Sequence, residues 1–164
     1  MGRRGPPGSD PRTPGALMRR GCLALALALL GCSRFAILHD ALSANEHNDL
    51  GVAYESSGDR QAAAREYRRA LRGDPRLARA RVNLGNVEAA AGRWKSAEHQ
   101  YRLALAVAPG DADARNNLAV ALLRRRRSLD EAEWLARSAV ALAGRRDTIA
   151  RATLSEVRAA ARRR

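Results

Sequence analysis

Two stretches of the chain decide its fold: NDLGVAYESSGDRQAAAREYRRALRGDP at residues 48–75 and VNLGNVEAAAGRWKSAEHQYRLALAVAP at residues 82–109. When the two stretches are aligned with each other, identical residues occur in pairs, and the two members of each pair are 34 positions apart. A period of this length indicates a protein in which one small structural unit recurs. The pairs are Leu50 and Leu84, Gly51 and Gly85, Gly58 and Gly92, Ala63 and Ala97, Tyr67 and Tyr101, Ala70 and Ala104, and Pro75 and Pro109.

A third copy follows at residues 116–142, NNLAVALLRRRRSLDEAEWLARSAVAL. Its Leu118 and Ala119 continue the 34-residue spacing. From Ala97 to Ala132 the spacing is 35, which predicts one inserted residue in the turn at 124–128. Further small residues of this copy match the alanines of the earlier ones: Ala132, Ala136 and Ala139.

Each copy has the pattern of two helices. Apolar residues recur three and four positions apart, as in Leu50, Ala53 and Tyr54, which places them on one helix face. Gly58 falls where the first helix must turn through positive φ, and Pro75 ends the second helix. Each pair leaves an apolar face open, so neighbouring pairs must stack. The abundance of Ala and Leu, with only 4% aromatic residues, argues against a β-sandwich or barrel.

This pattern of Leu-Gly, Tyr, Ala, Tyr, Ala and Pro resembles the tetratricopeptide repeat over about residues 44–143. The resemblance implies an all-α solenoid of antiparallel helix pairs, with repeats at 44–77, 78–111 and 112–146 and a capping helix at 147–164. The alternative for this last segment is a tail that binds nucleic acid. The chain departs from the family where aromatic residues are expected. Early in the first helix of each pair, it has His47, Arg81 and Arg115. In register with Tyr54, it has Glu88 and Leu122. These replacements predict weaker packing.

In tetratricopeptide repeats, the first helices of successive pairs line a concave groove. Asparagine side chains, which both donate and accept hydrogen bonds, suit the backbone of an extended peptide. The alternative is that Asn83 and Asn117 bridge or cap adjacent helices, and the two roles can coexist. By resemblance, the groove residues are Asn45, Asn48 and Asp49 in the first repeat, Arg79, Asn83 and Asn86 in the second, and Asp113, Asn116 and Asn117 in the third.

Some family members bind the C-terminal carboxylate of chaperones through a clamp of Lys, Arg and Asn. Asn83 matches one clamp position. The other clamp positions are occupied here by Asn48, Val52, Asp113 and Asn117. The resemblance therefore does not extend to this clamp, and chaperone-tail binding is not expected.

Motifs for catalysis or cofactor binding are missing from the sequence. His39, His47 and His99 lie far apart, and none has a Cys or carboxylate at a metal-ligand spacing. The chain has no glycine-rich nucleotide loop and no GxSxG motif. We therefore expect no enzymatic activity, no metal, no cofactor and no small-molecule substrate.

The N-terminal 31 residues have a different composition. Residues 1–17 are rich in Gly, Pro and Arg, which predicts disorder or an upstream extension of a gene that starts at Met18. Arg19 and Arg20 precede the apolar run GCLALALALLG at 21–31, which is too short to span a bilayer but suits a signal peptide over 18–31.

The sequence Leu29-Leu30-Gly31-Cys32 resembles the lipobox of bacterial lipoproteins, although Leu30 is a less usual residue there. The resemblance implies cleavage before Cys32, its lipidation, and a short linker over 32–43. Ser33 is, by the same resemblance, compatible with the outer membrane. The alternative is an uncleaved cytosolic chain with an N-terminal apolar helix and two free thiols.

Together these features predict a non-enzymatic scaffold that binds a protein or peptide in its groove. It would be lipid-tethered in the bacterial envelope, at the outer membrane facing the periplasm. The alternative is a cytosolic basic adaptor for nucleic acid, because the net charge is +13. Nucleic acid is the less expected partner, since Trp94 and Trp134 are predicted to contact the core instead of stacking on bases. The basic clusters are Arg65, Arg68, Arg69 and Arg72, residues 124–127, and residues 162–164.

Overall fold

The computed structural model describes residues 1–2, 41–144 and 147–163. The chain divides into two units, Met1–Ala41 and Leu42–Arg164, and the fold below is that of the second. The predicted signal peptide at 18–31, Cys32 and nearly all of the extension at 1–17 lie outside the described residues. Within the described ranges, no helix is both long and apolar enough to cross a membrane.

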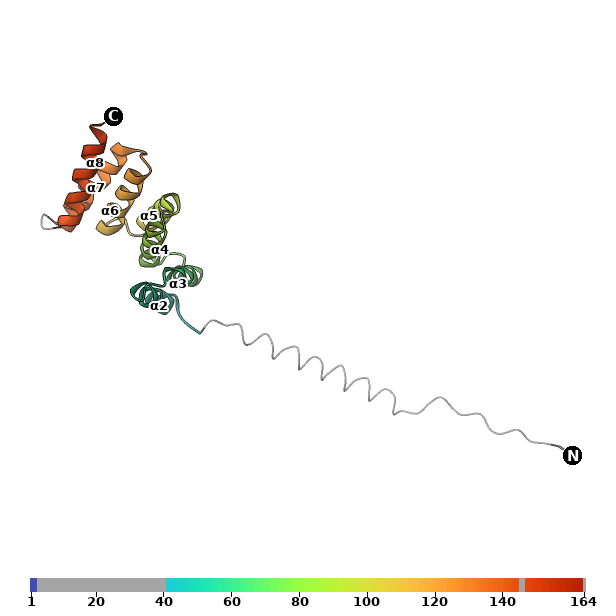
Figure 1. Ribbon diagram of the computed structural model, residues 1–164. Coiled ribbons are helices and arrows are strands. Elements are labelled where there is room, and N and C mark those ends of the chain that lie inside the picture. Colours follow the sequence, from blue (N-terminus) through green and yellow to red (C-terminus); the bar gives the residue numbers. More distant parts are fainter. Residues whose placement is uncertain (3–40, 145–146, 164) are drawn as a thin grey trace. The chain divides into compact units, whose positions relative to one another are not determined.

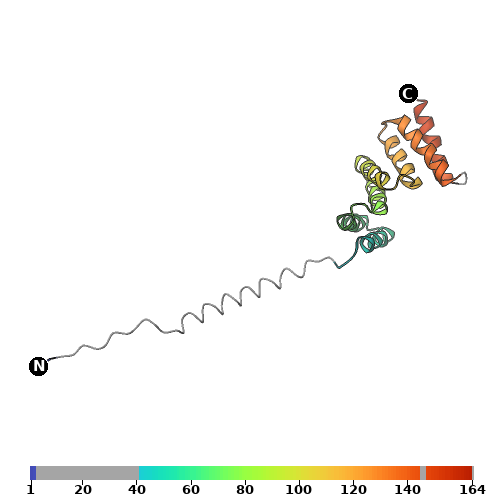
Figure 2. The same ribbon diagram turned by 180° about the vertical axis from the view of Figure 1, so that it is seen from behind.

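The second unit is an all-α solenoid built from antiparallel helix pairs (Figure 1). Each helix packs against the next one in the chain, and the first helix of each pair also contacts the first helix of the following pair. Seen from behind, the pairs follow one another in the same order (Figure 2). The helices of the described residues are α2 (Ala44–Ser56), α3 (Arg60–Gly73), α4 (Ala78–Ala90), α5 (Trp94–Val107), α6 (Ala112–Arg124), α7 (Leu129–Ala143) and α8 (Thr148–Ala161).

The turns inside the pairs follow the glycine pattern. Gly58 and Gly92 have φ of 87° and 73°, so each ends a first helix in the left-handed region, where glycine is the preferred residue. At the third turn this position is occupied by Arg126, with φ of 50°. The inserted residue lengthens this turn, and Ser128, next to the start of α7, also has positive φ (46°).

Helix starts and ends are set by local hydrogen bonds. Ser43 and Glu46 form a capping box at the start of α2, in which each side chain binds the other's backbone N–H. The side chains of Asp111 and Asp147 cap α6 and α8, because each accepts hydrogen bonds from backbone N–H groups of the first turn of its helix. Pro75 and Pro109 follow the ends of α3 and α5, as predicted from their spacing.

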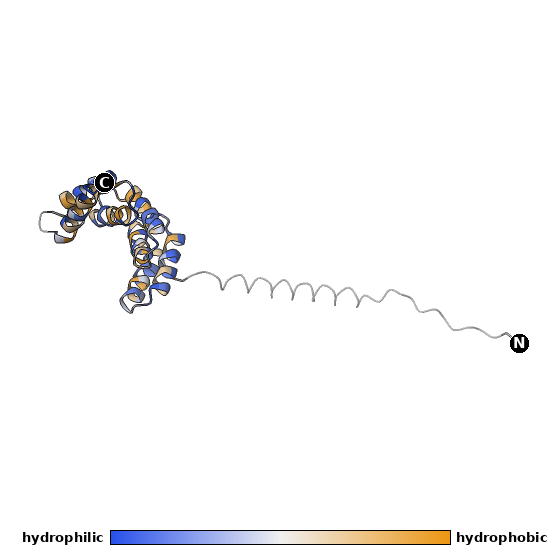
Figure 3. Cartoon of the chain, turned by 45° about the horizontal axis from the view of Figure 1, so that its top comes forward, coloured by the Kyte–Doolittle hydropathy of each residue, from blue (hydrophilic) through white to orange (hydrophobic). Residues whose placement is uncertain are grey.

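The core consists of small residues packed around two tyrosine rings. Tyr67 and Tyr101 are almost completely buried, and their rings lie against Gly51 and Gly85 of the facing helix. Most helices carry both hydrophobic and hydrophilic residues, as expected for a stack of thin layers (Figure 3). The other predicted repeat positions at 4% exposure or less are Ala63, Ala70, Leu84, Ala97, Ala104, Leu118, Ala119, Ala132, Ala136 and Ala139.

Two aromatic residues lie closer to solvent than the pattern indicates. Tyr54 is 37% exposed, whereas the residues in register with it, Glu88 and Leu122, are buried. The expectation that both tryptophans contact the core was wrong for Trp134, which is 61% exposed and lies under the Arg115 guanidinium. Trp134 is the sixth residue of α7, on its outer side, so its ring stacks on an arginine instead of entering the core.

The departures from the family pattern are compensated by polar contacts. His47 is buried and pairs with Glu66 at 2.8 Å. Arg81 and Arg115 each place Nε 3.0 Å from a proline carbonyl, that of Pro75 or Pro109. The packing lost by the missing aromatic rings is therefore partly replaced by one polar pair between α2 and α3 and by hydrogen bonds from α4 and α6 to the loops that precede them.

Helix α8 packs on α7 and α6, at the end of the stack. Its Val157 is completely buried and belongs to the main core cluster, and Leu154 packs against that cluster from outside. Ile149, by contrast, is 70% exposed. The helix thus covers the last apolar face with one side, which includes the buried Ala150 of its first turn, and leaves Ile149 exposed.

Candidate functional site

Asparagine side chains join the first helices of neighbouring pairs. All six asparagines of the chain lie on α2, α4 and α6. Between α2 and α4, the Asn83 amide donates to Asn48 Oδ1 at 3.0 Å. Nearby, Arg79 donates to Asn45 Oδ1 at 2.8 Å and lies 3.6 Å from an Asp49 oxygen.

The same arrangement continues between α4 and α6. The Asn117 amide donates to Asn86 Oδ1 at 3.0 Å, and the Tyr101 hydroxyl donates to the same oxygen at 2.9 Å. Asn83 and Asn117 therefore do bridge adjacent helices, which was one of the two roles open from the sequence. The second role, binding a partner, depends on what remains accessible around them.

We call the hydrogen-bonded pairs Asn48–Asn83 and Asn86–Asn117 the asparagine ladder. A hollow of about 290 Å³ lies beside this ladder, between the starts of α6 and α8 and the middle of α4. Asp147 and Ile149 close its far side, next to the first turn of α8. A second hollow, of about 250 Å³, also has Asn86 and Asn117 in its wall and extends along α4 to Trp94. The predicted groove residues that line the first hollow are Asn83, Asn86, Asp113, Asn116 and Asn117.

The nine predicted groove residues differ in exposure. Asn48 and Asn116 are only 3% and 8% exposed, so they support the surface from below. The others are exposed or half-buried: Asn45, Asp49, Arg79, Asn83, Asn86, Asp113 and Asn117. The structure brings five of the nine together at one hollow. The other four, Asn45, Asn48, Asp49 and Arg79, form a polar group over α2 and α4 that is joined to the five by the Asn83–Asn48 hydrogen bond.

One acceptor in the wall of the hollow is unused. The Oδ1 atom of Asn116 is buried, and it has no hydrogen-bond partner among the described residues. The Asn116 amide nitrogen, in contrast, donates weakly to Asn117 Oδ1 at 3.4 Å. Buried polar atoms of folded proteins are nearly always paired, so an acceptor without a partner is an unusual feature of this wall.

The tyrosine below the groove is held in its protonated form. Burial and the negative charge of Glu55 raise the pKa of Tyr101, and burial followed by the hydrogen bond to Glu55 raises the pKa of Tyr67. The Tyr101 hydroxyl donates a hydrogen bond to Asn86 Oδ1. This contact leaves the Asn86 amide nitrogen available to a ligand.

Sequence reasoning missed the contribution of α8 to this site. Ile149 stands two residues after the N-cap Asp147, as Asp113 stands two residues after the N-cap Asp111. Because 147–164 resembles a first helix, extending the groove positions to it would have identified Ile149. The groove therefore ends in an exposed apolar side chain.

The structure also bears on the other functional classes. In the described ranges, no three His, Cys, Asp or Glu side chains are grouped so that they could hold a metal ion. Several arginines of the basic clusters are used inside the fold: Arg68 pairs with Glu88 at 2.8 Å, and Arg69 with Glu66 at 3.0 Å. These arginines are less available to phosphates than the sequence alone indicates.

Comparison with solved structures identifies similar folds. The first TPR of Spaghetti (RPAP3) bound to the HSP90 peptide SRMEEVD has a TM-score of 0.69 at 20% identity, covering 77% of this chain and 98% of that one. The second TPR domain of human RPAP3, in complex with the HSP70 peptide SGPTIEEVD, has a TM-score of 0.65 at 19% identity, covering 70% and 94%. The Sgt2 TPR domain of Aspergillus fumigatus has a TM-score of 0.65 at 18% identity, covering 71% and 77%.

Comparison with curated protein sequences finds no match. The sequence profile described as "Tetratricopeptide repeat" matches residues 48–102 and 84–146, which together span more than half of the chain. The profile and the solved structures agree with the helix pairs and turns described above. The chain belongs to the tetratricopeptide repeat family.

Proposed function

We propose that this protein is a non-enzymatic adaptor that binds an extended peptide segment of a partner protein along the asparagine ladder. The observation that carries the proposal is the hollow lined by the half-buried Asn83, Asn86 and Asn117 together with the buried Asn116. Amide side chains can pair with peptide N–H and C=O groups without demanding a particular side chain. The TPR structures named above that hold HSP90 and HSP70 peptides support this function by analogy of fold.

The recognised segment is internal and not a C-terminal carboxylate. Asp113 is exposed at the hollow and would repel a carboxylate. Val52, at another clamp position, offers no charge. Ile149, at the end of the groove, instead favours an apolar side chain in the peptide.

A peptide library tests this function. Random dodecapeptides displayed on phage are selected on the full chain, and the enriched peptides are titrated against wild type and the double variant Asn83→Ala, Asn117→Ala. Loss of two amide contacts is expected to weaken binding about tenfold. Circular dichroism should show unchanged helicity, because the core residues are untouched.

The matched control is Gln61→Ala, which removes an exposed amide from the second helix α3 and should leave affinity unchanged. Equal affinity of the double variant and wild type would exclude the ladder as the binding surface. Unfolding of the double variant would show that the asparagines act only as bridges between helices.

We further propose that the adaptor is tethered by lipid at Cys32, in the bacterial outer membrane facing the periplasm. The support is the sequence pattern of residues 18–33. Intact mass spectrometry of the membrane fraction from bacteria that express the full chain should give a mature N-terminus at Cys32 with three acyl chains. Cys32→Ser should abolish this species, and an uncleaved soluble wild-type chain would contradict the tether.

A further inference from the structure

A third hollow, with a different chemistry, lies at the opposite ends of α6 and α8. Its volume is about 830 Å³, and it is bounded by the end of α6, the turn at 125–128, the start of α7 and the last turns of α8. It shares no lining residue with the asparagine-lined hollow. The two are therefore separate surfaces of the same unit.

The floor of this hollow is apolar and its rim is cationic. Leu129 and the half-buried Leu123 form the floor together with Ala159 and Ala160 of α8. The rim carries three exposed arginines, and one exposed carboxylate, Glu156, lies among them. The rim arginines are Arg124, Arg126 and Arg163.

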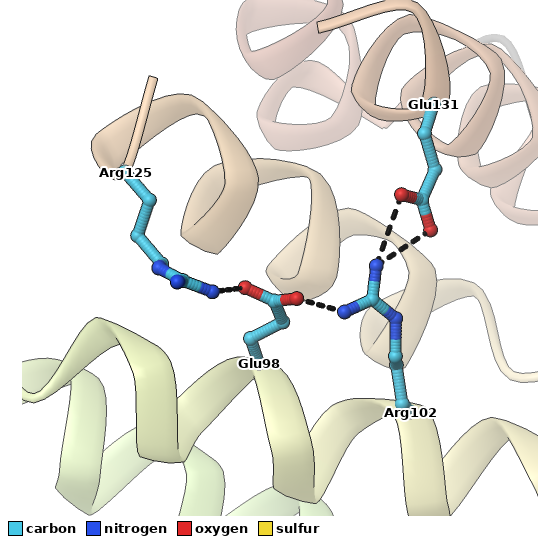
Figure 4. Close-up of polar contacts among 4 residues, drawn as sticks. All are labelled: Glu98, Arg102, Arg125 and Glu131. Carbon is cyan, nitrogen blue, oxygen red and sulfur yellow. Dashed lines mark hydrogen bonds and ion pairs between the residues drawn. The ribbon is translucent and has the colours of Figure 1, made fainter. Parts of the chain in front are cut away.

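The arginines at this turn are not equivalent. Arg125 is committed to the fold, because it pairs with the buried Glu98 (Figure 4). Arg124 lies over the Trp94 ring, with its guanidinium carbon 6.0 Å from the ring centre. Arg126 has no carboxylate partner in the described part of the chain and is exposed, so its guanidinium is accessible to an outside group.

Arg126 also occupies an unfavourable backbone conformation. Its φ is 50°, at the position where the first two repeats have Gly58 and Gly92. A side chain in the left-handed region costs about 1–2 kcal/mol. Strain of this kind is expected where the side chain serves a purpose that glycine could not serve.

We propose that this hollow binds an acidic peptide segment that carries one large apolar side chain. The apolar side chain packs on Leu123, Leu129 and Ala159, and the flanking carboxylates pair with the rim arginines. A volume of about 830 Å³ exceeds that of a single anion and accommodates several residues of peptide. This site is independent of the asparagine ladder, so an adaptor with both sites would hold two segments of a partner.

The test uses fluorescence anisotropy with the full chain. The probe is a fluorescein-labelled, C-terminally amidated hexapeptide, Glu-Glu-Asp-Leu-Glu-Glu. Two control peptides replace either all acidic residues by their amides or the leucine by glycine. Both control peptides should bind at least about fivefold more weakly, because each lacks one of the two complementary features.

Arg126→Gly is the decisive variant, because glycine suits the turn better than arginine does. Its melting temperature should rise by about 4 °C, while the affinity for the hexapeptide should fall about fivefold. Loss of binding then cannot be attributed to unfolding. The control Arg72→Gln, which removes one exposed charge in the last turn of α3, should leave the affinity unchanged.

A second pair of variants tests the floor without touching the arginines. Ala159→Glu places a carboxylate in the hollow and should abolish binding, whereas Ala152→Glu, on an exposed position of the same helix that does not line the hollow, should not. The variant Asn83→Ala, Asn117→Ala should bind the hexapeptide as wild type does, which separates this site from the peptide groove.

Three results would overturn the proposal. The first is equal binding of the amide peptide, which would remove the role of charge. The second is an unchanged affinity in Arg126→Gly. The third is displacement of the hexapeptide by phosphatidylglycerol vesicles that supply the same concentration of negative charge. If Arg126→Gly also loses binding to those vesicles, the hollow binds a membrane surface instead.

Discussion

The ring of Tyr101 lies where a side chain at position 85 would be. A Cβ atom on Gly85 would come 2.8 Å from Tyr101 Cδ1, and one on Gly51 would come 2.7 Å from Tyr67 Cδ1. Because both rings are buried, neither can move aside without displacing its neighbours. The repeated Leu-Gly of the sequence is thus explained by the repeated tyrosine that packs on it.

Substitution of Gly85 by alanine is therefore expected to destabilise the protein. The clash with a fully packed ring should lower the free energy of unfolding by about 2 kcal/mol, measured by urea denaturation. Gly110→Ala is the control, because a Cβ there meets no atom within 4 Å, and its effect should be small. Equal stability of the two variants would contradict the packing described here.

The buried tyrosines also predict the response to alkaline pH. The pKa values of Tyr67 and Tyr101 are raised in the folded state, chiefly by burial, so the folded state retains protons that the unfolded chain loses above about pH 10. Stability from these groups is complete below that pH and is lost as the pH rises further. Tyrosinate absorbance should therefore show their ionisation together with unfolding, and ionisation of all three tyrosines without any loss of helicity would contradict this.

At the scale of the helices, buried carboxylates hold neighbouring elements together. Glu98 of α5 is 7% exposed and pairs with both Arg102 and Arg125, and Arg102 in turn donates to both Glu131 oxygens at 2.9 Å (Figure 4). These contacts join α5 to the turn after α6 and to α7. The network explains why Arg125 is fixed while Arg126 beside it is available.

Glu98→Gln tests the contribution of this network. Removing the buried charge leaves the half-buried Arg125 without its carboxylate partner and Arg102 with Glu131 alone, and the free energy of unfolding should fall by about 2 kcal/mol. The control is Glu131→Gln, at the exposed side of the same network, which should cost about 0.5 kcal/mol. If both variants lower the free energy of unfolding by the same amount, the burial of Glu98 is not the reason that its ion pairs stabilise the fold.

At the scale of the whole molecule, the architecture was largely predictable from the sequence, and its polar contacts were not. The period of 34, the two glycine turns and the two prolines predicted the helix pairs, because each reflects local backbone geometry. Each buried glutamate has an arginine partner three to five positions away, but Glu88 and Glu98 also pair with the distant Arg68 and Arg125. No local pattern encodes these distant pairings.

The candidate site was predicted in part. The asparagines were identified from their place on the first helices, and the structure puts five of the nine predicted residues around one hollow. The exposed Ile149 was missed because the mapping stopped at the third repeat. The cationic hollow was missed because it needs the ends of α6 and α8 to lie together, which depends on how the last helix packs.

The most direct test of the account is an NMR titration of the side-chain amides. The chain has six asparagines, all on first helices, and two glutamines, Gln61 and Gln100, on second helices. Adding a library-selected peptide to the labelled full chain should shift the amide signals of Asn83, Asn86, Asn116 and Asn117 and leave both glutamine signals in place. Unshifted asparagine signals, with the peptide demonstrably bound, would contradict the proposal that the ladder is the binding surface.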